Sequence, residues 1–481
     1  MKNETYRVRF APAPTGMMHL GNVRTALMNY LFAQQKQGTF ILRIEDTDTA
    51  RNFDPQAKEI IADLTWLSIT YQEGPIIGGP YTPYFQSQRN NIYQEKLDEL
   101  KNLRKIYPCF CSTEELEKKR VRQQALKQPP RYDRTCLNLS LTEREQKMQT
   151  DPHLWRVQLP IDEQVTIHDL SHGDITFDFK NFSDFPLTRM DGTFTFMFAN
   201  FVDDMTMQMT HVFRGDDHLT NTAGQAALYR AFNIALPTFW HMPIICNTEG
   251  RKLSKRDFGF SLRDLKNSGY LPQAICNYLA TIGGSYEQEI MSLEELITHV
   301  KFENLHSASH VKYDVEKLNW MNQQWIKRLD TAKLIPHARP ILESTYPKVK
   351  DMSNTQLKQL LEPIKNELPT LQAAIKELSF FFTKPELTRE IFASCGTPEQ
   401  LSALATILKT HMGSLEDSVV YMDALKQDAK EQAIPLKLLF HTLRVSLTGK
   451  PEGQSIINLI LILGLAETSS RLNAAIDLLQ K

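Results

Sequence analysis

Two short stretches, far apart in the sequence, constrain this chain more than any other feature. The first, residues 12–22 (PAPTGMMHLGN), separates an alternating run at residues 6–11 from an apolar-periodic run at residues 21–37. This order predicts a strand, a loop and a helix, whose N-terminal N–H groups can face an anion. The second stretch, residues 252–256 (KLSKR), adds two lysines and an arginine. Together the two stretches predict a site for a ligand that carries phosphate.

The start of the chain predicts the first crossover of a parallel sheet. A strand at residues 6–11, a helix at residues 21–37 and a strand at residues 39–44 form a β-α-β crossover. Ligands of such sheets bind at the carboxyl ends of the strands, where Glu45 is expected. We expect Asp46 and Asp48, which follow Glu45, to be surface and capping residues.

The rest of the chain changes character twice. Residues 108–190 combine a charged helix with short alternating strands, which predicts an α+β insertion in the sheet. After it the sheet pattern is expected to resume, and from residue 262 onward the pattern is helical. The expected elements are helices at 54–68, 114–127, 221–232, 356–367 and 436–445, and strands or extended stretches at 154–159, 176–179, 194–200, 211–215 and 239–246.

Length and composition limit the class of protein. A chain of 481 residues predicts two to four domains, and a net charge of -1 means that any nucleic acid must be bound by local basic patches. The longest apolar run, residues 456–465, is far shorter than the ~20 residues of a membrane-spanning helix. No signal peptide is recognised, and six scattered cysteines favour free thiols, so we expect a cytoplasmic protein.

The order, spacing and surroundings of the two signatures resemble those of class I aminoacyl-tRNA synthetases. The segment at residues 9–16 (RFAPAPTG) is similar to the glutamyl-tRNA synthetases in particular. The resemblance covers nearly all of the segment 1–330, including residues 81–89, 107–111 and 269–272. Over the segment 331–481 it rests only on helical pattern and length.

The resemblance implies a fold and a division into domains. The fold is α/β: a Rossmann-type parallel sheet with an α+β insertion, followed by an all-α anticodon-binding region. The implied domains are the first half of the catalytic domain at 1–107, an inserted acceptor-stem-binding domain at 108–190, the second half of the catalytic domain with the KLSKR loop at 191–260, a helical stem-contact domain at 261–330, and an anticodon-binding region at 331–481.

The activity implied is that of a glutamate-tRNA ligase. Glutamate is activated by ATP with Mg2+ to glutamyl-adenylate, and the glutamyl group then passes to the 3' end of tRNA. Displacement at the α-phosphorus depends on positioning and preorganised positive charge. His19, Lys252 and Lys255 are the implied catalytic residues, with His19 donating to a phosphate oxygen. The implied ATP site comprises Thr15, Gly16, His19, Gly21, Asn22, Lys252, Leu253, Ser254, Lys255 and Arg256.

The resemblance also implies how glutamate is selected. Arg9 matches an arginine that holds a substrate carboxylate, for which a planar guanidinium is suited. Glu45 matches the residue that accepts the substrate ammonium group. The implied substrate-binding set is Arg9, Ala11, Glu45, Asn200 and Arg214. The alternative for each charged member is a strand-end charge that pairs with a neighbour.

Three positions depart from the family pattern. Ala13 stands where relatives often carry Ser, which removes a possible hydroxyl contact. Phe196 replaces a usual Tyr, so a hydroxyl contact to the bound amino acid is in doubt. Gly283 and Gly284 replace a usual Gly-Trp pair, which indicates a packing change.

Structural zinc is a possibility that the sequence leaves open. Cys109, Cys111, Tyr132 and Cys136 offer three thiolates and a phenol at a spacing similar to that of zinc-binding relatives. Asn138 stands where some relatives carry His, and zinc prefers four clear N or S ligands. The alternative is a group of small buried cysteines.

Other functions must be separated from the main hypothesis. A non-discriminating enzyme would also charge the glutamine tRNA. A glutaminyl enzyme would show Pro-Pro-Glu-Pro-Asn where this chain has residues 11–15 (APAPT), and a catalytically silent tRNA-binding paralogue could have lost Arg9, His19, Glu45 and Lys255. The expected partners are a glutamate-accepting tRNA, L-glutamate and ATP, without a membrane, and the protein is expected to be a monomer.

Overall fold

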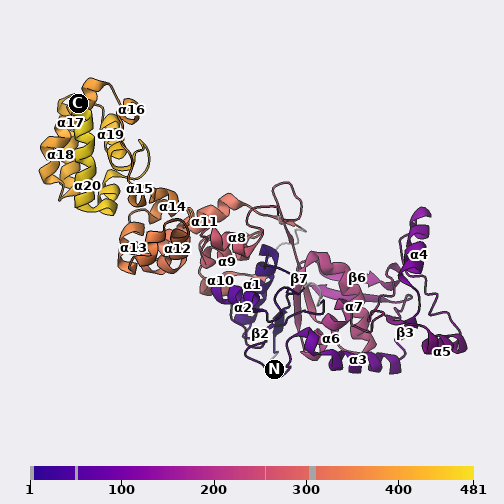
Figure 1. Ribbon diagram of the computed structural model, residues 1–481. Helices are drawn as coiled ribbons and strands as arrows, with labels where there is room; N and C mark the ends of the chain where they lie inside the picture. The colour runs from indigo at the N-terminus through magenta and orange to yellow at the C-terminus, as the bar shows by residue number, and fades with distance from the viewer. Residues whose placement is uncertain (1–4, 49–51, 255, 303–309, 481) are drawn as a thin grey trace. The chain divides into compact units, whose positions relative to one another are not determined.

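The computed structural model describes residues 5–48, 52–254, 256–302 and 310–480 (Figure 1). Its residues form two compact units. Unit 1 comprises Met1–Asp264 and Ile275–Val315, and unit 2 comprises Leu265–Ala274 and Glu316–Lys481. Unit 1 contains all the strands of the described chain, whereas unit 2 is built from helices.

Short strands alternate with helices in unit 1. The strands are β1 (Arg7–Phe10), β2 (Thr39–Leu42), β3 (Ile106–Cys109), β4 (Leu154–Val157), β5 (Gln164–Asp169), β6 (Gly173–Asp178), β7 (His211–Gly215), β8 (Thr238–Met242), β9 (Ile244–Cys246) and β10 (His310–Lys312). The helices are α1 (Leu20–Gln35), α2 (Lys58–Trp66), α3 (Asn90–Asn102), α4 (Thr113–Ala125), α5 (Leu141–Thr150), α6 (Phe196–Thr206), α7 (Leu219–Ala231) and α10 (Leu293–His299), with short 3-10 turns η2 (Gln86–Gln88), η3 (Phe179–Asn181) and η4 (Asp216–His218).

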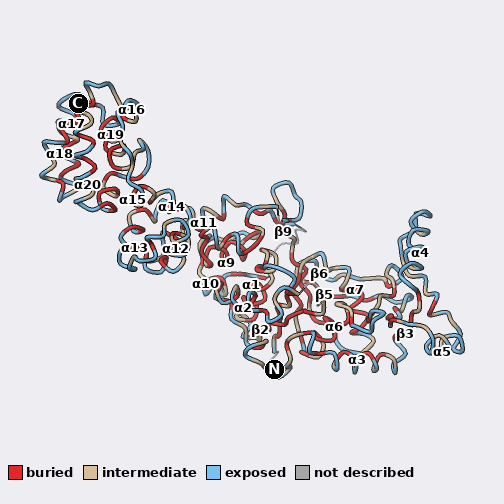
Figure 2. Tube along the Cα trace, viewed as in Figure 1, coloured by how far each residue is buried: buried red, intermediate tan, exposed pale blue. Residues whose placement is uncertain are grey.

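The expected β-α-β crossover is present at the start of the chain. Strands β1 and β2 pair in parallel, from Arg7 opposite Thr39 to Phe10 opposite Leu42, and α1 connects them. Gly38 permits a close approach after the helix, because a Cβ atom there would lie 2.5 Å from the backbone oxygen of Tyr6. Figure 2 shows buried residues along α1 and the strands beside it, as expected for a sheet covered by this helix.

The α+β insertion is joined to the sheet of unit 1. Strands β6, β5, β8 and β7 form one four-stranded sheet in that order. Strand β5 pairs antiparallel with β6 but also pairs with β8, where Asp169 lies opposite Phe239. Strands β7 and β8 are parallel, and β3 and β4 form a separate antiparallel pair. The expected strands near 154–159, 176–179 and 211–215 are therefore confirmed.

One expected strand is wrong. Residues 194–200 do not resume the sheet, because α6 begins at Phe196. The aromatic run has the composition of a strand, but the residues from Phe198 to Asp204 are all buried, so the helix is surrounded by other parts of the unit and shows no alternation of buried and exposed residues. The helix also carries Asp203 and Asp204 into the interior.

Unit 2 continues as helices. Two helices, α8 (Leu262–Asn267) and α9 (Pro272–Thr281), have residues in both units. The others are α11 (Val315–Arg328), α12 (Thr331–Thr345), α13 (Asn354–Leu361), α14 (Ala373–Glu377), α15 (Ser379–Phe382), α16 (Arg389–Ala393), α17 (Pro398–His411), α18 (Ser418–Glu431), α19 (Leu436–Thr448) and α20 (Ile456–Gln480), with η6 (Pro347–Asp351), η7 (Lys365–Glu367) and η8 (Met412–Ser414).

The last helix, α20, is long and apolar enough by itself to cross a membrane. Half of its most apolar stretch is buried inside the protein, where α20 packs against α17 and α19. Gly464 has a φ of 72° and interrupts the helix. These properties fit a core helix of unit 2.

Candidate active site

Main-chain hydrogen bonds join the first signature to residues 260–262, which follow the second. The N–H of Leu20, at the start of α1, donates to the oxygen of Phe260 (3.0 Å), and the N–H of Leu262 donates to the oxygen of Met18 (2.9 Å). His19 and Ser261 thereby form an isolated antiparallel bridge. The segment that follows KLSKR is thus fixed against the start of α1.

A cavity of about 480 Å3 opens between these segments. Most of the expected site residues line it: Arg9, Ala11, His19, Gly21, Asn22, Glu45, Asn200, Arg214, Lys252, Leu253 and Ser254. Thr15, Gly16 and Arg256 are exposed and do not line it. Lys255 lies outside the described residues.

His19 is the N-cap of α1. Its Nδ1 accepts from the N–H of Asn22 (3.2 Å), and the Asn22 side chain accepts from the N–H of His19 (3.4 Å). Burial, and then the charge of Lys252, lower the pKa of His19 below its usual 6.5. A neutral ring that accepts at Nδ1 carries its proton on Nε2, which is then free to donate to a ligand. Gly21 suits this arrangement, because a Cβ atom there would lie 3.0 Å from the ring.

Lys252 forms an ion pair that the sequence analysis did not identify. Its Nζ lies 2.7 Å from Oδ2 of Asp217, which follows β7 in η4. Both side chains line the cavity and remain largely exposed. In the same loop, Asp257 accepts from the N–H and Oγ of Ser254, both at 2.8 Å, so the serine hydroxyl is used to shape the turn.

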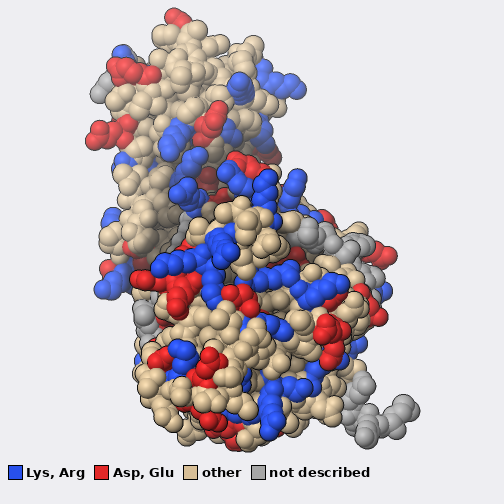
Figure 3. Space-filling model, turned by 90° about the vertical axis from the view of Figure 1, so that its right-hand side faces the viewer, with Lys and Arg blue, Asp and Glu red and all other residues tan. Residues whose placement is uncertain are grey.

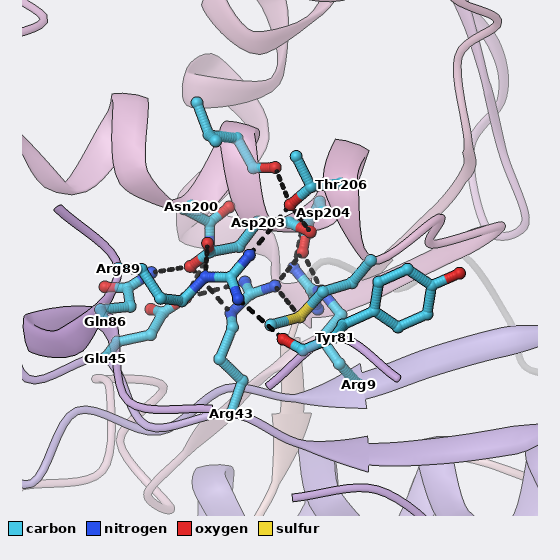
Figure 4. Close-up of polar contacts among 12 residues, drawn as sticks. Arg9, Arg43, Glu45, Tyr81, Gln86, Arg89, Asn200, Asp203, Asp204 and Thr206 are labelled. Carbon is cyan, nitrogen blue, oxygen red and sulfur yellow. Dashed lines mark hydrogen bonds and ion pairs between the residues drawn. The ribbon is translucent and has the colours of Figure 1, made fainter. Parts of the chain in front are cut away.

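Arg9 is anchored by a buried carboxylate (Figure 4). Its Nε and Nη2 donate to the two oxygens of Asp204 at 3.0 and 3.1 Å, and its Nη1 donates to the oxygen of Phe213. Arg9 therefore has a carboxylate partner within the protein. A guanidinium has five N–H donors, so two remain for a ligand in the cavity.

Behind Arg9 lies a buried network that the sequence analysis missed. Arg43 donates to Asp204 (2.7 Å) and to Glu45 (3.0 Å), and Arg89 donates to Asp203 (2.6 Å). Figure 4 shows these side chains converging from the segment after β2, from the residue after η2 and from α6. Burial acts to raise the pKa of Asp204, but Arg9 and Arg43 outweigh it and lower that pKa. The only available signal was two adjacent acids within an aromatic run.

Glu45 and Asn200 are in direct contact. Asn200 Nδ2 donates to Glu45 Oε1 at 2.6 Å, and its own Oδ1 accepts from Gln225. Burial raises the pKa of Glu45, while Arg43 opposes the shift. Glu45 offers the cavity a carboxylate, which suits an ammonium group.

Arg214 differs from the other buried arginines. Among the described residues, it has no carboxylate within ion-pair distance, and its contacts are Gln225 Oε1 (2.7 Å), Thr222 Oγ1 and His241 Nε2. Burial, and then the nearby charge of Arg9, lower its pKa to about 10. An unbalanced guanidinium in a cavity is suited to bind a ligand carboxylate.

Two further predictions are tested by the same region. Phe196 lines the cavity with its ring 6.1 Å from that of His218, and it has no hydroxyl to offer.

The expectation that Asp46 is a surface residue is wrong. Asp46 is buried and accepts from the N–H (2.8 Å) and Oγ (2.6 Å) of Ser87, because the chain folds over the end of β2 at η2.

The cysteines of the insertion do come together. The sulfur atoms of Cys109, Cys111 and Cys136 all lie within 4.8 Å of one another, and all three residues are buried. The Tyr132 hydroxyl is 3.4 Å from the Cys109 sulfur and 3.6 Å from the Cys111 sulfur. A hydrogen bond from Cys136 lowers the pKa of Cys109, although burial opposes it. Three thiols and a phenol could hold one metal ion.

Comparisons with known proteins agree with this site. Residues 5–320 match the catalytic domain of class I tRNA synthetases (E and Q), and residues 332–476 match an anticodon-binding domain. Glutamate--tRNA ligase 1 of Syntrophomonas wolfei is 37% identical and the match covers 99% of this chain and 97% of that protein. Glutamate--tRNA ligase 1 of Pseudothermotoga lettingae is 38% identical, with 97% and 99% covered.

Two solved structures are similar over nearly the whole chain. A glutamate tRNA ligase from Elizabethkingia meningosepticum, in complex with its amino acid, has a TM-score of 0.86 and 30% identity, covering 99% of this chain and 100% of that one. Glutamate-tRNA synthetase from Elizabethkingia anophelis has the same TM-score and identity, with 98% and 100% covered. The expected fold class is confirmed, and the chain belongs to the class I tRNA synthetases of the E and Q family.

Proposed function

We propose that this ligase activates L-glutamate with ATP and transfers the glutamyl group to a glutamate-accepting tRNA. One observation carries the proposal. A single cavity combines Arg214, a buried cation without a carboxylate partner in the described part of the chain, with Glu45, a carboxylate, and with His19 and Lys252 from the two signatures. An amino acid with two carboxylates and an ammonium group, placed beside a triphosphate, matches these charges.

Selection of glutamate over glutamine would rest on charge. Arg214, together with the two remaining N–H groups of Arg9, would meet the side-chain carboxylate, and Glu45 would accept from the ammonium group. Glutamine would leave the buried guanidinium of Arg214 facing a neutral amide, which is unfavourable by several kcal/mol, of the order found for an unpaired buried charge. Asn200 would hold Glu45 in place, since it already donates to that carboxylate.

The remaining residues would bind ATP. The Nε2–H of His19 and the N-terminus of α1 would face phosphate oxygens, and Gly21 would allow them to come close. Lys252 would leave Asp217 for the pyrophosphate as charge develops on it, with Lys255 and Arg256 as further cations. The glutamate α-carboxylate attacks the α-phosphorus, pyrophosphate leaves, and the tRNA hydroxyl then displaces AMP. Mg2+ would arrive with ATP as part of the substrate.

Zinc in the insertion is proposed as a structural ion. The 3.6 Å between the sulfur atoms of Cys111 and Cys136 is close to the ~3.7 Å that two thiolates span on tetrahedral zinc with bonds of ~2.3 Å. Cys109, Cys111 and Cys136 would be the thiolate ligands, and Tyr132 is placed to be the fourth. Such an ion would tie β3 to the loop that precedes α5.

We also propose that the insertion and unit 2 both bind tRNA. Helix α4 has no buried residue, and its second half exposes Lys118, Arg120 and Arg122. Figure 3 looks toward the end of unit 1 that carries the insertion and shows lysine and arginine side chains there, with acidic ones among them. The insertion would hold the acceptor stem, residues 261–330 would contact the stem, and residues 331–481 would bind the anticodon arm.

We propose a cytoplasmic monomer that is not attached to a membrane.

The test is charging with purified components. The protein is incubated with ATP, Mg2+ and each tRNA for glutamate or glutamine, with either amino acid. Glutamyl-tRNA, formed with one AMP and one pyrophosphate, is expected. Glutamylation of both tRNAs would identify a non-discriminating enzyme, and comparable use of glutamine would identify a glutaminyl enzyme. No product with either amino acid would indicate a silent tRNA-binding paralogue.

A further inference from the structure

A line of buried hydrogen bonds runs from Arg214 to a distant carboxylate. Nη2 of Arg214 donates to Oγ1 of Thr222 at 2.5 Å, and this oxygen lies 2.8 Å from Nε2 of His241. Nδ1 of His241 lies 2.7 Å from Oδ2 of Asp169. Arg214 lines the cavity, whereas the other three side chains lie behind it.

The chemistry of the end groups fixes the direction of these bonds. A guanidinium can only donate and a carboxylate can only accept. The Thr222 hydroxyl, which accepts from Arg214, has its own hydrogen for Nε2 of His241 at 2.8 Å, which is nearer than its other acceptor, the backbone oxygen of His218 at 3.3 Å. His241 then carries its proton on Nδ1 and donates it to Asp169. Every hydrogen points from the cation toward the anion.

Asp169 is built to remain ionised. It is 1% exposed, at the end of β5, where the parallel pairing with β8 brings it beside His241. Its carboxylate also accepts from the N–H of His241 (3.0 Å) and from Ser171 and His172. Burial would raise the pKa of Asp169, but the hydrogen bonds from His241 and His172 outweigh it and lower that pKa. Thr222 and His241 are fully buried.

This arrangement leaves N–H groups of Arg214 available for a ligand in the cavity. Its Nε faces His241 Nε2 (3.3 Å), while Nη1 and Nη2 each use one N–H, for Gln225 and Thr222. Among the described residues, no acceptor takes the second N–H of either Nη atom. Each Nη atom therefore keeps one N–H, and guanidinium N–H groups suit the oxygens of a ligand carboxylate.

We propose that Asp169, His241 and Thr222 form a relay that positions Arg214 for the side-chain carboxylate of glutamate. This inference rests on the proposed function. The relay ends in the negative charge of Asp169, on the side of Arg214 that faces away from the cavity. The buried guanidinium is therefore stabilised without a protein carboxylate on its cavity side. A carboxylate in direct contact, such as Asp204 on Arg9, would occupy the N–H groups that the substrate needs. The three relay members are positioning residues, since none of them lines the cavity.

Loss of the relay should weaken the binding of glutamate but not that of ATP. Without it, Arg214 loses two hydrogen bonds and can turn toward Gln225. The KM for glutamate should rise about tenfold or more, because losing a hydrogen bond to a charged group typically changes binding affinity by about that factor. The KM for ATP should stay within twofold, since no relay residue reaches the phosphate side. The preference for glutamate over glutamine should fall by the same factor.

Three variants separate the links of the relay. Thr222→Val keeps the shape and removes the hydroxyl, whereas Thr222→Ser keeps the hydroxyl and should recover most of the glutamate affinity. Asp169→Asn can keep its one oxygen for His241, but it removes the charge and puts an amide donor where the other oxygen accepts from Ser171 and His172. Asp174→Asn is the matched control, because Asp174 bonds to His168 at 2.9 Å in the same pair of strands, but on the surface. Each full-length variant is assayed by ATP–pyrophosphate exchange in the presence of tRNA, and its melting temperature is measured.

The outcomes decide between positioning and general structure. A selective rise in the glutamate KM for Thr222→Val and Asp169→Asn, with recovery in Thr222→Ser, supports the relay. An unchanged glutamate KM, or equal rises in both KM values that follow the loss of melting temperature, would overturn it. A wild-type protein that does not charge tRNA with glutamate at all would instead refute the proposed function.

Discussion

Lys252 and Asp217 are joined across the cavity by an ion pair of 2.7 Å, so the second signature is tethered to the segment after β7. The side chains are 64% and 45% exposed. An exposed pair of this kind contributes only about 0–1 kcal/mol. Breaking the ion pair between Lys252 and Asp217 therefore costs little free energy, so Lys252 can bind a triphosphate instead.

Replacing Lys252 should separate catalysis from stability. We expect Lys252→Ala to lower the rate of glutamate activation by about two orders of magnitude or more, because a transition-state charge contact is worth about 3 kcal/mol. The free energy of unfolding should change by less than about 1 kcal/mol. Arg251→Ala is the control, since Arg251 lies in the same loop and does not line the cavity. Parallel loss of activity and melting temperature would indicate a structural lysine.

The two roles of His19 can be separated by two substitutions. Asn is a good N-cap, so His19→Asn should keep α1 stable while it removes the Nε2 donor. His19→Ala loses both and should cost about 1 kcal/mol more in stability. Exchange rates and urea unfolding test both variants. If His19→Asn were fully active, His19 would be a cap only.

The titration of His19 should respond to Lys252. Burial and the charge of Lys252 both lower the pKa of His19. Removing that charge in Lys252→Met should therefore raise the pKa, without restoring 6.5, because burial is the larger cause. In the wild type the unfolded state takes up the proton first, so the stability from neutral His19 is complete above pH 6.5 and falls below it. NMR of the imidazole across pH 4–8 measures both proteins, and a pKa lowered equally in both would contradict the role of Lys252.

Local patterns predicted the parts of the site that are continuous in sequence. The loop before α1 and the strand–helix–strand start follow from local pattern, whereas Glu45, Asn200 and Arg214 were expected from the family resemblance of the short motifs that contain them. The partners of these residues could not be predicted in this way. Asp204 reaches Arg9 from 195 positions away, and no periodicity encodes that distance.

Composition also misled where burial is unusual. The aromatic run before residue 200 has strand-forming residues, yet it begins α6. This helix buries both Asp203, which pairs with Arg89, and Asp204, which pairs with Arg43. Domain boundaries were also not predictable from local pattern. The predicted boundary at residue 331 falls inside unit 2, where Asn322 donates to the oxygen of Pro369. The five-domain division remains a prediction.

The cysteine cluster gives a prediction about metal content. If zinc is bound, the purified protein should contain about one equivalent, and Cys136→Ser should lower both zinc content and melting temperature. Cys276→Ser is the control, because Cys276 is a buried thiol outside the cluster. Full stability of a zinc-free protein would favour simple buried thiols.

Arg9 and Arg214 should differ in what their loss changes. Arg9→Gln removes one of the two arginines that balance the buried Asp204, so it should lower the free energy of unfolding by about 3–5 kcal/mol. Arg214→Gln leaves no contacting carboxylate unpaired and should cost less stability, yet it should nearly abolish the preference for glutamate over glutamine. Arg230→Gln, a change of an exposed arginine on α7, is the control for both.

The measurements are kcat/KM for each amino acid and the thermal midpoint of each variant. The Arg214 variant should show the larger fall in glutamate kcat/KM relative to its loss of stability, because its guanidinium faces the cavity without a protein carboxylate. The Arg9 variant should combine weaker glutamate binding with a lower midpoint. A full glutamate preference in Arg214→Gln would remove Arg214 from the selector role. It would leave Arg9 as the cation that the substrate carboxylate meets.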